Sequence, residues 1–240
     1  MTTTVEKPSE AGKKAAPSSP DQQSDSAKRS DSAKRSNADK VSRRQVDKFS
    51  ERRDQLAEAA LQTLAELGYA RTSLREIAQN SEFSHGVLHY YFADKVELIT
   101  ACVRRYKAGC VTRYDEIVAT AETADELRAE FGVAMAATLR QDATLHRLWY
   151  DLRTQSLFDP AYRPDVVEID QSLERMIWRI VARCGELAGT APTVTEPLAY
   201  ALFDGLFQQA LLAHLAGDTG AGDRLDTQVV AALDTLVPRR

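Results

Sequence analysis

Residues 72–95 read TSLREIAQNSEFSHGVLHYYFADK, and the rest of the chain is best understood from this stretch. Ser73 and Glu76 have the S-x-x-E spacing of a capping box, in which the hydroxyl and the carboxylate each satisfy a free backbone N–H at a helix start. Residues 80–83 have no helical periodicity and are few enough for a turn. The first half of the stretch therefore predicts a short helix that ends in a tight turn.

A second short helix is expected directly after this turn. Ser84 is a good N-cap, and Leu88 and Phe92 are spaced to lie on the inward face of that helix. Asp94 is placed to cap the helix that follows. Two short helices joined by a tight turn form a helix-turn-helix, in which residues 84–92 would enter a DNA major groove.

Four short groups of residues within and just after this stretch form a sequence motif. Residues 73–78 read SLREIA, residues 84–88 read SHGVL, residues 91–92 read YF and residues 95–98 read KVEL. The arrangement resembles the DNA-binding region of TetR/AcrR-type transcriptional regulators, whose pattern is close to T-x-R-x-I-A, a turn, S-x-G-x-L-x-x-Y-F and x-x-K-x-x-L. The resemblance is dense, although it covers less than a quarter of the chain.

Two residues depart from the family pattern. Glu82 stands where the family usually has a turn glycine, and a non-glycine residue in a left-handed conformation costs about 1–2 kcal/mol. We therefore expect the turn to differ slightly. His89 stands where an aromatic residue is usual, so its contact is expected to be weaker or sensitive to pH.

The resemblance implies an all-α fold with two helical domains. Residues 46–95 would be a three-helix DNA-binding domain with the helix-turn-helix, and residues 96–240 a larger helical domain for ligand binding and dimerisation. The implied function is a ligand-responsive transcriptional regulator, a repressor, which binds a near-palindromic operator in double-stranded DNA as a dimer and is released by a small molecule. A transcriptional activator on the same fold and a protein-interaction module without DNA binding are the alternatives.

The expected DNA contacts lie around the second helix of the motif. Lys95 would contact a phosphate, Val87 a thymine methyl group, and His85 a guanine or an adenine. Gly86 would let the helix approach closely. The predicted DNA-binding residues are Ser73, Arg75, Ser84, His85, Gly86, Val87, His89, Tyr90 and Lys95.

A metal site and an active site are both weak interpretations. His85 and His89 stand at positions i and i+4, but Glu82 is the only nearby third ligand, and two ligands do not hold zinc. The chain has no nucleophile elbow, no phosphate-binding glycine loop and no convincing pair of carboxylates. We therefore predict no metal, no cofactor and no enzymatic activity.

Charge is distributed unevenly along the chain. The net charge is −4, but residues 1–95 hold 16 Lys/Arg and 14 Asp/Glu, a net charge of +2. The remaining residues hold 15 Lys/Arg and 21 Asp/Glu, a net charge of −6. The basic share therefore lies beside the helix-turn-helix, where phosphate contacts would be made.

Cysteine usage and hydropathy bound the compartment. Cys102, Cys110 and Cys184 are odd in number and form no C-x-x-C motif, so we expect free thiols and no disulfide framework. No apolar run approaches the roughly 18 residues of a membrane span, and the N-terminus has no apolar signal region. We expect a cytoplasmic protein with no membrane partner.

Residues 1–45 form a tail of low complexity. The tail is rich in Ser, Ala, Lys, Asp and Pro, and the hexapeptide DSAKRS occurs twice in succession, at residues 25–30 and 31–36. A segment with so few large apolar residues cannot offset its ordering entropy, so we predict disorder. The basic residues of the tail either add phosphate contacts or belong to a solvated linker.

Apolar residues at three- and four-residue spacing predict about nine helices in all. Apart from the two of the helix-turn-helix, they are expected over residues 50–67, 95–119, 125–140, 142–158, 169–184, 196–215 and 223–237. The helix at 196–215 is apolar on two sides, so one side needs a partner. Residues 196–215 and 223–237 of two copies would form the four-helix bundle that is usual in TetR-like homodimers. A well-buried helix of a single chain is the alternative.

The resemblance also implies a pocket for a mostly apolar small molecule in the body. Apolar and aromatic residues suited to line such a pocket recur on its helices. They are Met135, His146, Trp149, Phe158, Met176, Trp178, Phe203 and Phe207. Plain core packing is the alternative for each of them. Trp178 lies off the main apolar stripe of its helix, which favours a pocket or an interface.

Overall fold

The computed structural model describes residues 1–2, 21–68 and 72–239, with the backbone alone for residues 21–43. The chain falls into two units, Met1–Ser50 and Glu51–Arg240. Within the described ranges, no helix is at once long enough and apolar enough to cross a bilayer.

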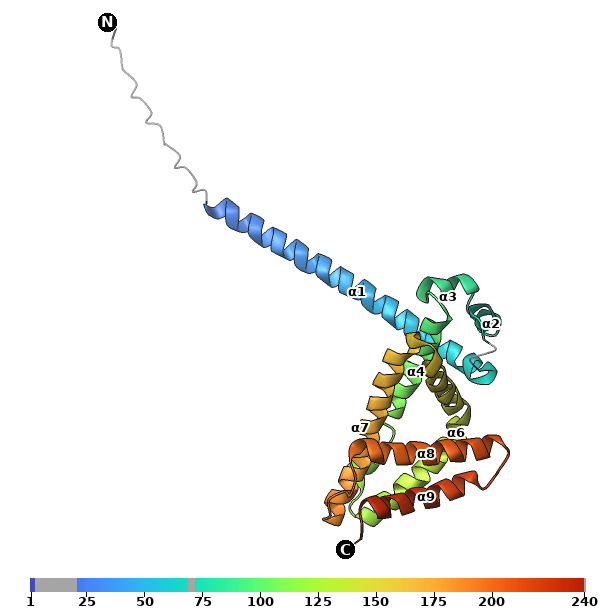
Figure 1. Cartoon of the computed structure of the whole chain (residues 1–240). Helices are drawn as coiled ribbons and strands as arrows, with labels where there is room; N and C mark the ends of the chain where they lie inside the picture. Colours follow the sequence, from blue (N-terminus) through green and yellow to red (C-terminus); the bar gives the residue numbers. More distant parts are fainter. Residues whose placement is uncertain (3–20, 69–71, 240) are drawn as a thin grey trace. The chain divides into compact units, whose positions relative to one another are not determined.

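The described residues are helical and contain no strand, as predicted (Figure 1). The first helices are α1 (Asp21–Leu67), α2 (Leu74–Gln79), α3 (His85–Tyr91), α4 (Lys95–Cys110) and α5 (Asp115–Thr120). The others are α6 (Ala124–Phe158), the 3-10 turn η1 (Pro160–Tyr162), α7 (Arg163–Ala188), α8 (Glu196–Leu215) and α9 (Ala221–Leu236).

Helix α1 begins far before its predicted start at residue 50. The structure places residues 21–45 of the predicted disordered tail in this helix, while residues 3–20 lie outside the described part of the chain. No proline interrupts residues 21–67, and Ala, Lys, Arg and Gln, which have high helix propensity, are frequent there. Gly68 ends the helix with φ +76°, a left-handed conformation that is common for a glycine after a helix.

The C-terminal part of α1 packs with α2, α3 and α4 around one apolar core. Leu56, Leu64 and Ile77 are fully buried in it. Leu88 and Phe92, the predicted inward residues of the second motif helix, are 0% and 1% exposed. This core holds α3 by one face and leaves the other face open.

Helix α4 ends at Cys110, before its predicted end near residue 119. The backbone turns after Cys110, where the carbonyl oxygen of Val111 accepts a 2.5 Å hydrogen bond from Arg179 Nη2 on α7. The same arginine pairs with Asp115 at the start of α5. A tertiary contact that is remote in sequence therefore divides the predicted helix into α4 and α5.

Helix α6 joins two helices that were predicted to be separate. The expected break survives only as a kink at Asp142, with φ −117° and ψ 18°. The Asp142 carboxylate accepts a hydrogen bond from the Tyr106 hydroxyl at 3.2 Å and pairs with Arg113 at 2.6 Å. The kink thus lies where α6 is bound to α4 and to the turn that follows α4.

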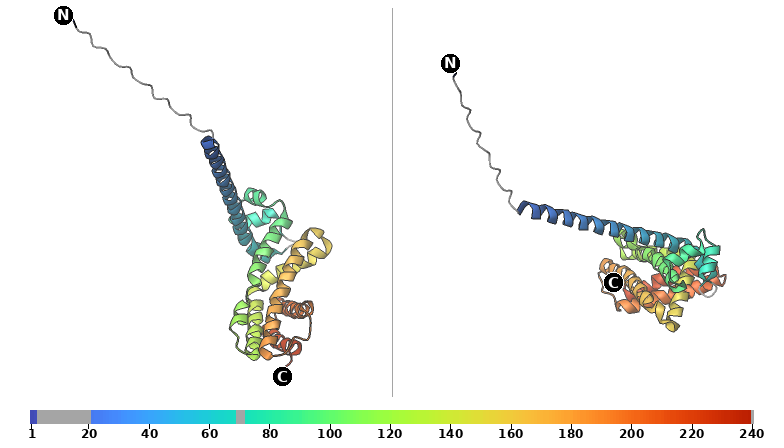
Figure 2. Two further views of the ribbon diagram at one scale, coloured as in Figure 1. Left: turned by 90° about the vertical axis from the view of Figure 1, so that its left-hand side faces the viewer. Right: turned by 90° about the horizontal axis from the view of Figure 1, so that it is seen from above.

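Helices α8 and α9 lie side by side at the end of the 51–240 unit that is remote from α2 and α3 (Figures 1 and 2). Both pack against α6. Helix α8 spans the predicted residues 196–215, and its Phe203 and Phe207 are buried. Leu198, Leu202 and Leu212 are 57%, 37% and 72% exposed. One apolar side of α8 is therefore covered within the subunit and the other is open.

Candidate functional site

The predicted capping box is present at the start of α2. The backbone N–H of Glu76 donates to Ser73 Oγ at 3.2 Å, and the backbone N–H of Ser73 donates to Glu76 Oε2 at 2.7 Å. Both free donors of the helix start are thus satisfied by local partners. The sequence alone was sufficient to predict this feature, because all its atoms lie within four residues.

Helices α3 and α4 also begin at the predicted caps. Ser84 Oγ accepts from the backbone N–H of Val87 at 3.3 Å, and Asp94 Oδ1 accepts from the backbone N–H of Glu97 at 2.9 Å. Every described residue with positive φ is a glycine, so Glu82 in the turn is not left-handed. The turn therefore avoids the cost that a left-handed glutamate would carry.

The predicted DNA-binding residues are accessible. Ser73, Arg75, Ser84, His85, Gly86, His89 and Tyr90 are exposed, and Val87 and Lys95 are half-buried. On α3 the exposed side chains lie opposite the buried Leu88, so the helix presents a face of polar and small residues to solvent. A helix held in this way can enter a major groove without unfolding its own core.

The two histidines of α3 contact each other. His85 Nε2 and His89 Nε2 are 3.1 Å apart, and the rings meet edge to face with centroids 4.4 Å apart. One of these nitrogens donates to the other, and the tautomers set the direction. In the described part of the chain, no group of three His, Cys, Asp or Glu side chains is placed to hold a metal ion.

A cavity of about 60 Å³ lies in the body between α4, α6, α7 and α8. Six of the eight residues predicted for a pocket line it together. They are Met135, His146, Trp149, Met176, Phe203 and Phe207.

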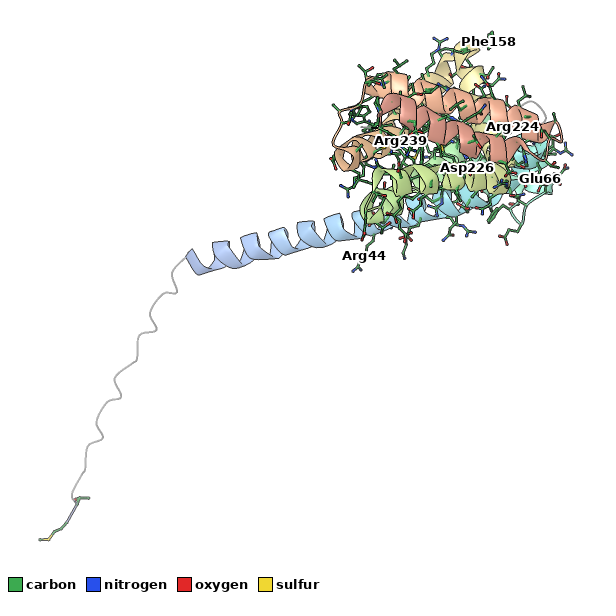
Figure 3. All side chains as sticks on the ribbon, turned by 90° about the horizontal axis from the view of Figure 1, so that it is seen from below. Arg44, Glu66, Phe158, Arg224, Asp226 and Arg239 are labelled. Carbon is green, nitrogen blue, oxygen red and sulfur yellow. The ribbon has the colours of Figure 1, made fainter. Side chains whose placement is uncertain are left out.

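The other two predicted pocket residues do not line the cavity. Phe158, at the C-terminal end of α6, is 79% exposed and points outward (Figure 3). Its side chain therefore lies outside this cavity, although it was predicted as a pocket residue. Trp178 is half-buried on α7, beside the core. Its position off the main stripe directs it away from the cavity.

Lys107 lines the cavity with a buried ammonium group, and the sequence prediction missed it. Its side chain is 3% exposed, and Nζ lies 3.3 Å from His146 Nδ1 and 5.1 Å from the centre of the Trp149 ring. Burial lowers the pKa of Lys107 to about 8. Its spacing from Val103 and Cys110 on the apolar stripe of α4 was a signal, but a lysine is normally assigned to the surface.

His146 and Trp149 carry polar atoms that the protein does not satisfy. Burial, and then the neighbouring Lys107 charge, hold the pKa of His146 well below its usual value, so the ring is neutral. Among the described residues, neither His146 Nε2 nor Trp149 Nε1 has a hydrogen-bond partner, although both are buried. Such atoms are uncommon in folded proteins and call for an explanation.

A charged network borders the cavity. Arg153 on α6 pairs with Asp170 on α7 at 3.2 Å and with Asp204 on α8 at 2.5 Å. The Tyr150 hydroxyl donates to Asp204 at 2.9 Å, and the Tyr200 hydroxyl donates to Asp170 at 2.6 Å. The network fixes three helices of the body to one another. Sequence reasoning did not find it, because the partners come from three separate helices.

The chain is similar to known bacterial transcriptional regulators. Residues 56–102 match the model of the family described as bacterial regulatory proteins, tetR family. The HTH-type transcriptional regulator BetI of Burkholderia mallei (strain NCTC 10229) is 30% identical over 200 residues, which are 78% of this chain and 95% of the relative.

Two solved structures share the fold. The Bacillus subtilis transcriptional regulator FadR, in complex with stearoyl-CoA, has a TM-score of 0.61 and 19% identity, and the match covers 77% of this chain and 97% of FadR. A TetR transcription regulator from Haloarcula marismortui ATCC 43049 has a TM-score of 0.60 and 18% identity, and covers 78% of this chain and 99% of its own.

Proposed function

This chain belongs to the TetR family of bacterial regulatory proteins, and we propose that it is a repressor that binds a near-palindromic DNA operator as a homodimer and is released by a small molecule. The observation that carries the proposal is the geometry of α3. The helix is capped at Ser84, is held by the buried Leu88 and presents His85, Gly86 and His89 to solvent.

The exposed face of α3 supports sequence-specific contact. Gly86 has no side chain, so the first turn of the helix approaches base edges closely. His85 and Val87 then lie within reach of the edges that distinguish base pairs in the major groove. Ser73, Tyr90 and Lys95 carry hydroxyl or ammonium groups that suit phosphate oxygens.

The open side of α8 supports the homodimer. Leu198, Leu202 and Leu212 recur at helical spacing on that side and are exposed in the single subunit. An apolar surface of this kind is typical of an interface. A second copy would cover it and place two α3 helices on successive major grooves, about 34–36 Å apart or more if the site is bent.

The body cavity supports a small-molecule effector, which is apolar for most of its surface. The structure of FadR contains stearoyl-CoA, which sets a precedent for this fold. The cavity of about 60 Å³ is smaller than a typical ligand pocket of roughly 300–1,000 Å³, so an effector must push the helices apart. Lys107 belongs to α4, and α4 follows α3 directly. Movement of α4 would therefore change the distance between the two DNA-binding domains of the dimer.

The free energy that couples effector binding to operator binding has an expected range. A coupling free energy of about 1–3 kcal/mol between effector and operator would weaken DNA binding about 5- to 150-fold. The kink at Asp142 joins α4 to α6 through Tyr106. Arg147 of α6 also donates to the Ala65 carbonyl of α1 at 2.6 Å. These contacts give the cavity two mechanical connections to the DNA-binding helices.

An electrophoretic mobility shift tests the proposal directly. The purified full chain is titrated against duplex DNA from the region upstream of its own gene, at low salt, beside an unrelated duplex of equal length. We expect a shifted band with the upstream duplex, which an excess of the unrelated duplex does not remove. Absence of any specific complex would overturn the proposal and favour an interaction module. An operator position that raises transcription would instead identify an activator.

Replacing Lys95 by alanine should weaken binding equally on all sequences. The ammonium group is expected to release about one counterion per subunit, so the slope of log K against log salt should shrink by about one for each subunit. The measurement is a salt series by fluorescence anisotropy. The control is Arg175→Ala, which removes an exposed positive charge from α7. A slope that stays unchanged in the Lys95 variant would remove this residue from the contact surface.

A further inference from the structure

Three buried nitrogen groups line the cavity, and all of them are donors. Lys107 Nζ lies 3.3 Å from His146 Nδ1, which must accept because the lysine is predominantly protonated at pH 7. In a neutral imidazole the other nitrogen, Nε2, then carries the hydrogen. The indole Nε1 of Trp149 is always a donor. His146 Nε2 and Trp149 Nε1 have no acceptor among the described residues.

The charge of Lys107 also lacks a direct partner. Among the described residues, no carboxylate lies within ion-pair distance of its Nζ, and its close neighbours are the His146 ring and the faces of Trp149 and Tyr106. A buried ammonium without a carboxylate partner is costly, and an anion delivered by a ligand would remove that cost. The missing partner is therefore an acceptor that carries negative charge.

From this arrangement we infer that the effector is an apolar molecule with one anionic head, a monocarboxylate, which is bound by Lys107 with hydrogen bonds from His146 Nε2 and Trp149 Nε1. The inference rests on the proposed function only in calling this ligand an effector. The cavity and its donors are properties of the subunit alone.

The neighbouring carboxylates do not take the place of such a head. Asp204 and Asp170 both pair with Arg153, and each accepts a hydrogen bond from a tyrosine hydroxyl. Their strongest interactions are therefore with Arg153 and these tyrosines, and not with Lys107. Their remaining negative charge raises the pKa of Lys107 and so opposes part of the lowering by burial. A second anion beside Asp204 is disfavoured, which directs the head towards the lysine side of the cavity.

The rest of the cavity wall suits an apolar body. Beside Asp204 and the hydroxyls of Tyr114, Thr138, Tyr150 and Tyr200, which all have partners within the protein, aliphatic, thioether and aromatic side chains from α6, α7 and α8 form it. They are Met135, Leu173, Met176, Ile177, Phe203 and Phe207. Methionines fill irregular space and repack easily, so this wall can widen around a chain or a ring.

Lys107 also lines a second hollow, on the outer side of α4. This groove, of about 240 Å³, lies between α4 and α7 and includes Arg104, Glu168 and Ser172. Arg104 closes its rim through ion pairs of 2.5 Å with Asp165 and 2.6 Å with Glu168. Lys107 thus stands between the inner cavity and the surface.

The test uses the full chain with Trp178→Phe, which leaves Trp149 as the single tryptophan of the chain. Its fluorescence is followed during titration with straight-chain carboxylates from acetate to dodecanoate, each beside its amide and its trimethylammonium analogue. For the tail length that fits, we expect the carboxylate to bind about 10- to 100-fold more tightly than the amide, the range for a hydrogen bond to a charged group. No carboxylate binding, equal binding of amide and carboxylate, or preference for the cation would each overturn the inference.

Replacing Lys107 by methionine keeps the length and removes the charge. We expect the variant to lose the preference for the carboxylate, which falls about 10- to 100-fold in affinity, while the amide loses much less because its carbonyl oxygen carries no charge. Retained binding of the amide shows that the cavity is intact. Trp149→Phe, followed by calorimetry, should weaken binding of the carboxylate more than binding of the amide. A carboxylate preference that survives Lys107→Met would contradict the role of the lysine.

Carboxylate affinity should fall as pH rises through about 8. The charged form of Lys107 exists below its pKa of about 8, so attraction is present at pH 7 and is lost by up to tenfold per unit at higher pH. The neutral His146 does not titrate in this range. The other charged or titratable groups that act on the lysine are Cys110 and Arg113 near the end of α4, Asp170 on α7 and Asp204 on α8.

The Lys107→Met variant provides the control for this pH series. Its weak carboxylate binding should show no dependence on pH between 7 and 9.5, so a dependence seen only in the parent protein identifies Lys107. These measurements contain no DNA. Failure of carboxylate binding therefore leaves the mobility shift unaffected, and a missing operator leaves the carboxylate site unaffected. Addition of the best carboxylate to the protein–DNA complex then shows whether the ligand is the effector.

Discussion

Replacing Gly86 by glutamate is expected to abolish operator binding while leaving the protein folded. A side chain at this position meets no atom within 4 Å in the subunit, so the fold has room for it. Gly86 lies in the first turn of α3, where a negative charge is favourable and a glycine is not. The free energy of unfolding should therefore stay level or rise.

The same substitution should weaken DNA binding, although it does not destabilise the fold. The new carboxylate would occupy the space through which α3 approaches the bases and would repel the phosphates on either side. A lost base contact costs about 1–3 kcal/mol, and the dimer loses it twice, so we expect affinity to fall at least about 100-fold. Fluorescence anisotropy with operator DNA and thermal unfolding of the same sample measure the two effects.

The matched control is Gly109→Glu. Gly109 also lies in a helix and also has no atom within 4 Å of an added Cβ, but it belongs to the far end of α4. The two variants change the net charge equally, so long-range repulsion affects both. Loss of binding in the Gly86 variant alone identifies contact at α3. Equal binding by both variants would place the DNA interface elsewhere.

Replacing Leu202 by arginine is expected to separate the proposed dimer into monomers. Leu202 is 37% exposed on the open side of α8, between Leu198 and Leu212. In the dimer two arginine charges would be buried without partners, and an uncompensated buried charge costs about 3–5 kcal/mol. In the monomer the long side chain reaches solvent, so the fold is retained. Sedimentation analysis should give half the mass of the parent protein.

Operator affinity should fall with the dimer. The DNA-binding domain of a monomer makes half of the phosphate and base contacts of the dimer. We therefore expect operator affinity to fall at least about 100-fold at nanomolar protein. Leu157→Arg is the control, because Leu157 is 72% exposed on α6, outside α8 and α9. It should remain dimeric and bind normally. A dimer that persists in the Leu202 variant would exclude this side of α8 from the interface.

How far the sequence predicted each feature depends on how local its atoms are. The caps at Ser73, Ser84 and Asp94 use partners within three residues, and all three were predicted correctly. The helix between residues 142 and 158 was predicted as a separate element, whereas in the structure it is the second part of α6, beyond a kink. Tyr106 and Arg113, which hold the kink, are remote in sequence.

The pocket shows the same division. Of the eight residues suggested for the pocket that the resemblance implies, six line the cavity together. The sequence did not reveal that the Phe158 side chain is exposed, nor that a lysine lies inside. Burial of Lys107 depends on Trp149, Tyr106 and His146, which come from different turns of two helices.

By itself, the sequence determined the helical class, the helix-turn-helix with its caps and the two-sided character of α8. These properties depend on spacing along one helix or on hydrogen bonds to neighbouring residues, so a short segment of the sequence is enough to predict them. Only the tertiary structure decided where α4 ends, which residues share the cavity and which charge is buried in it. Those properties arise when groups remote in the chain meet and exclude water, and the free energy of such contacts is set by the packed arrangement.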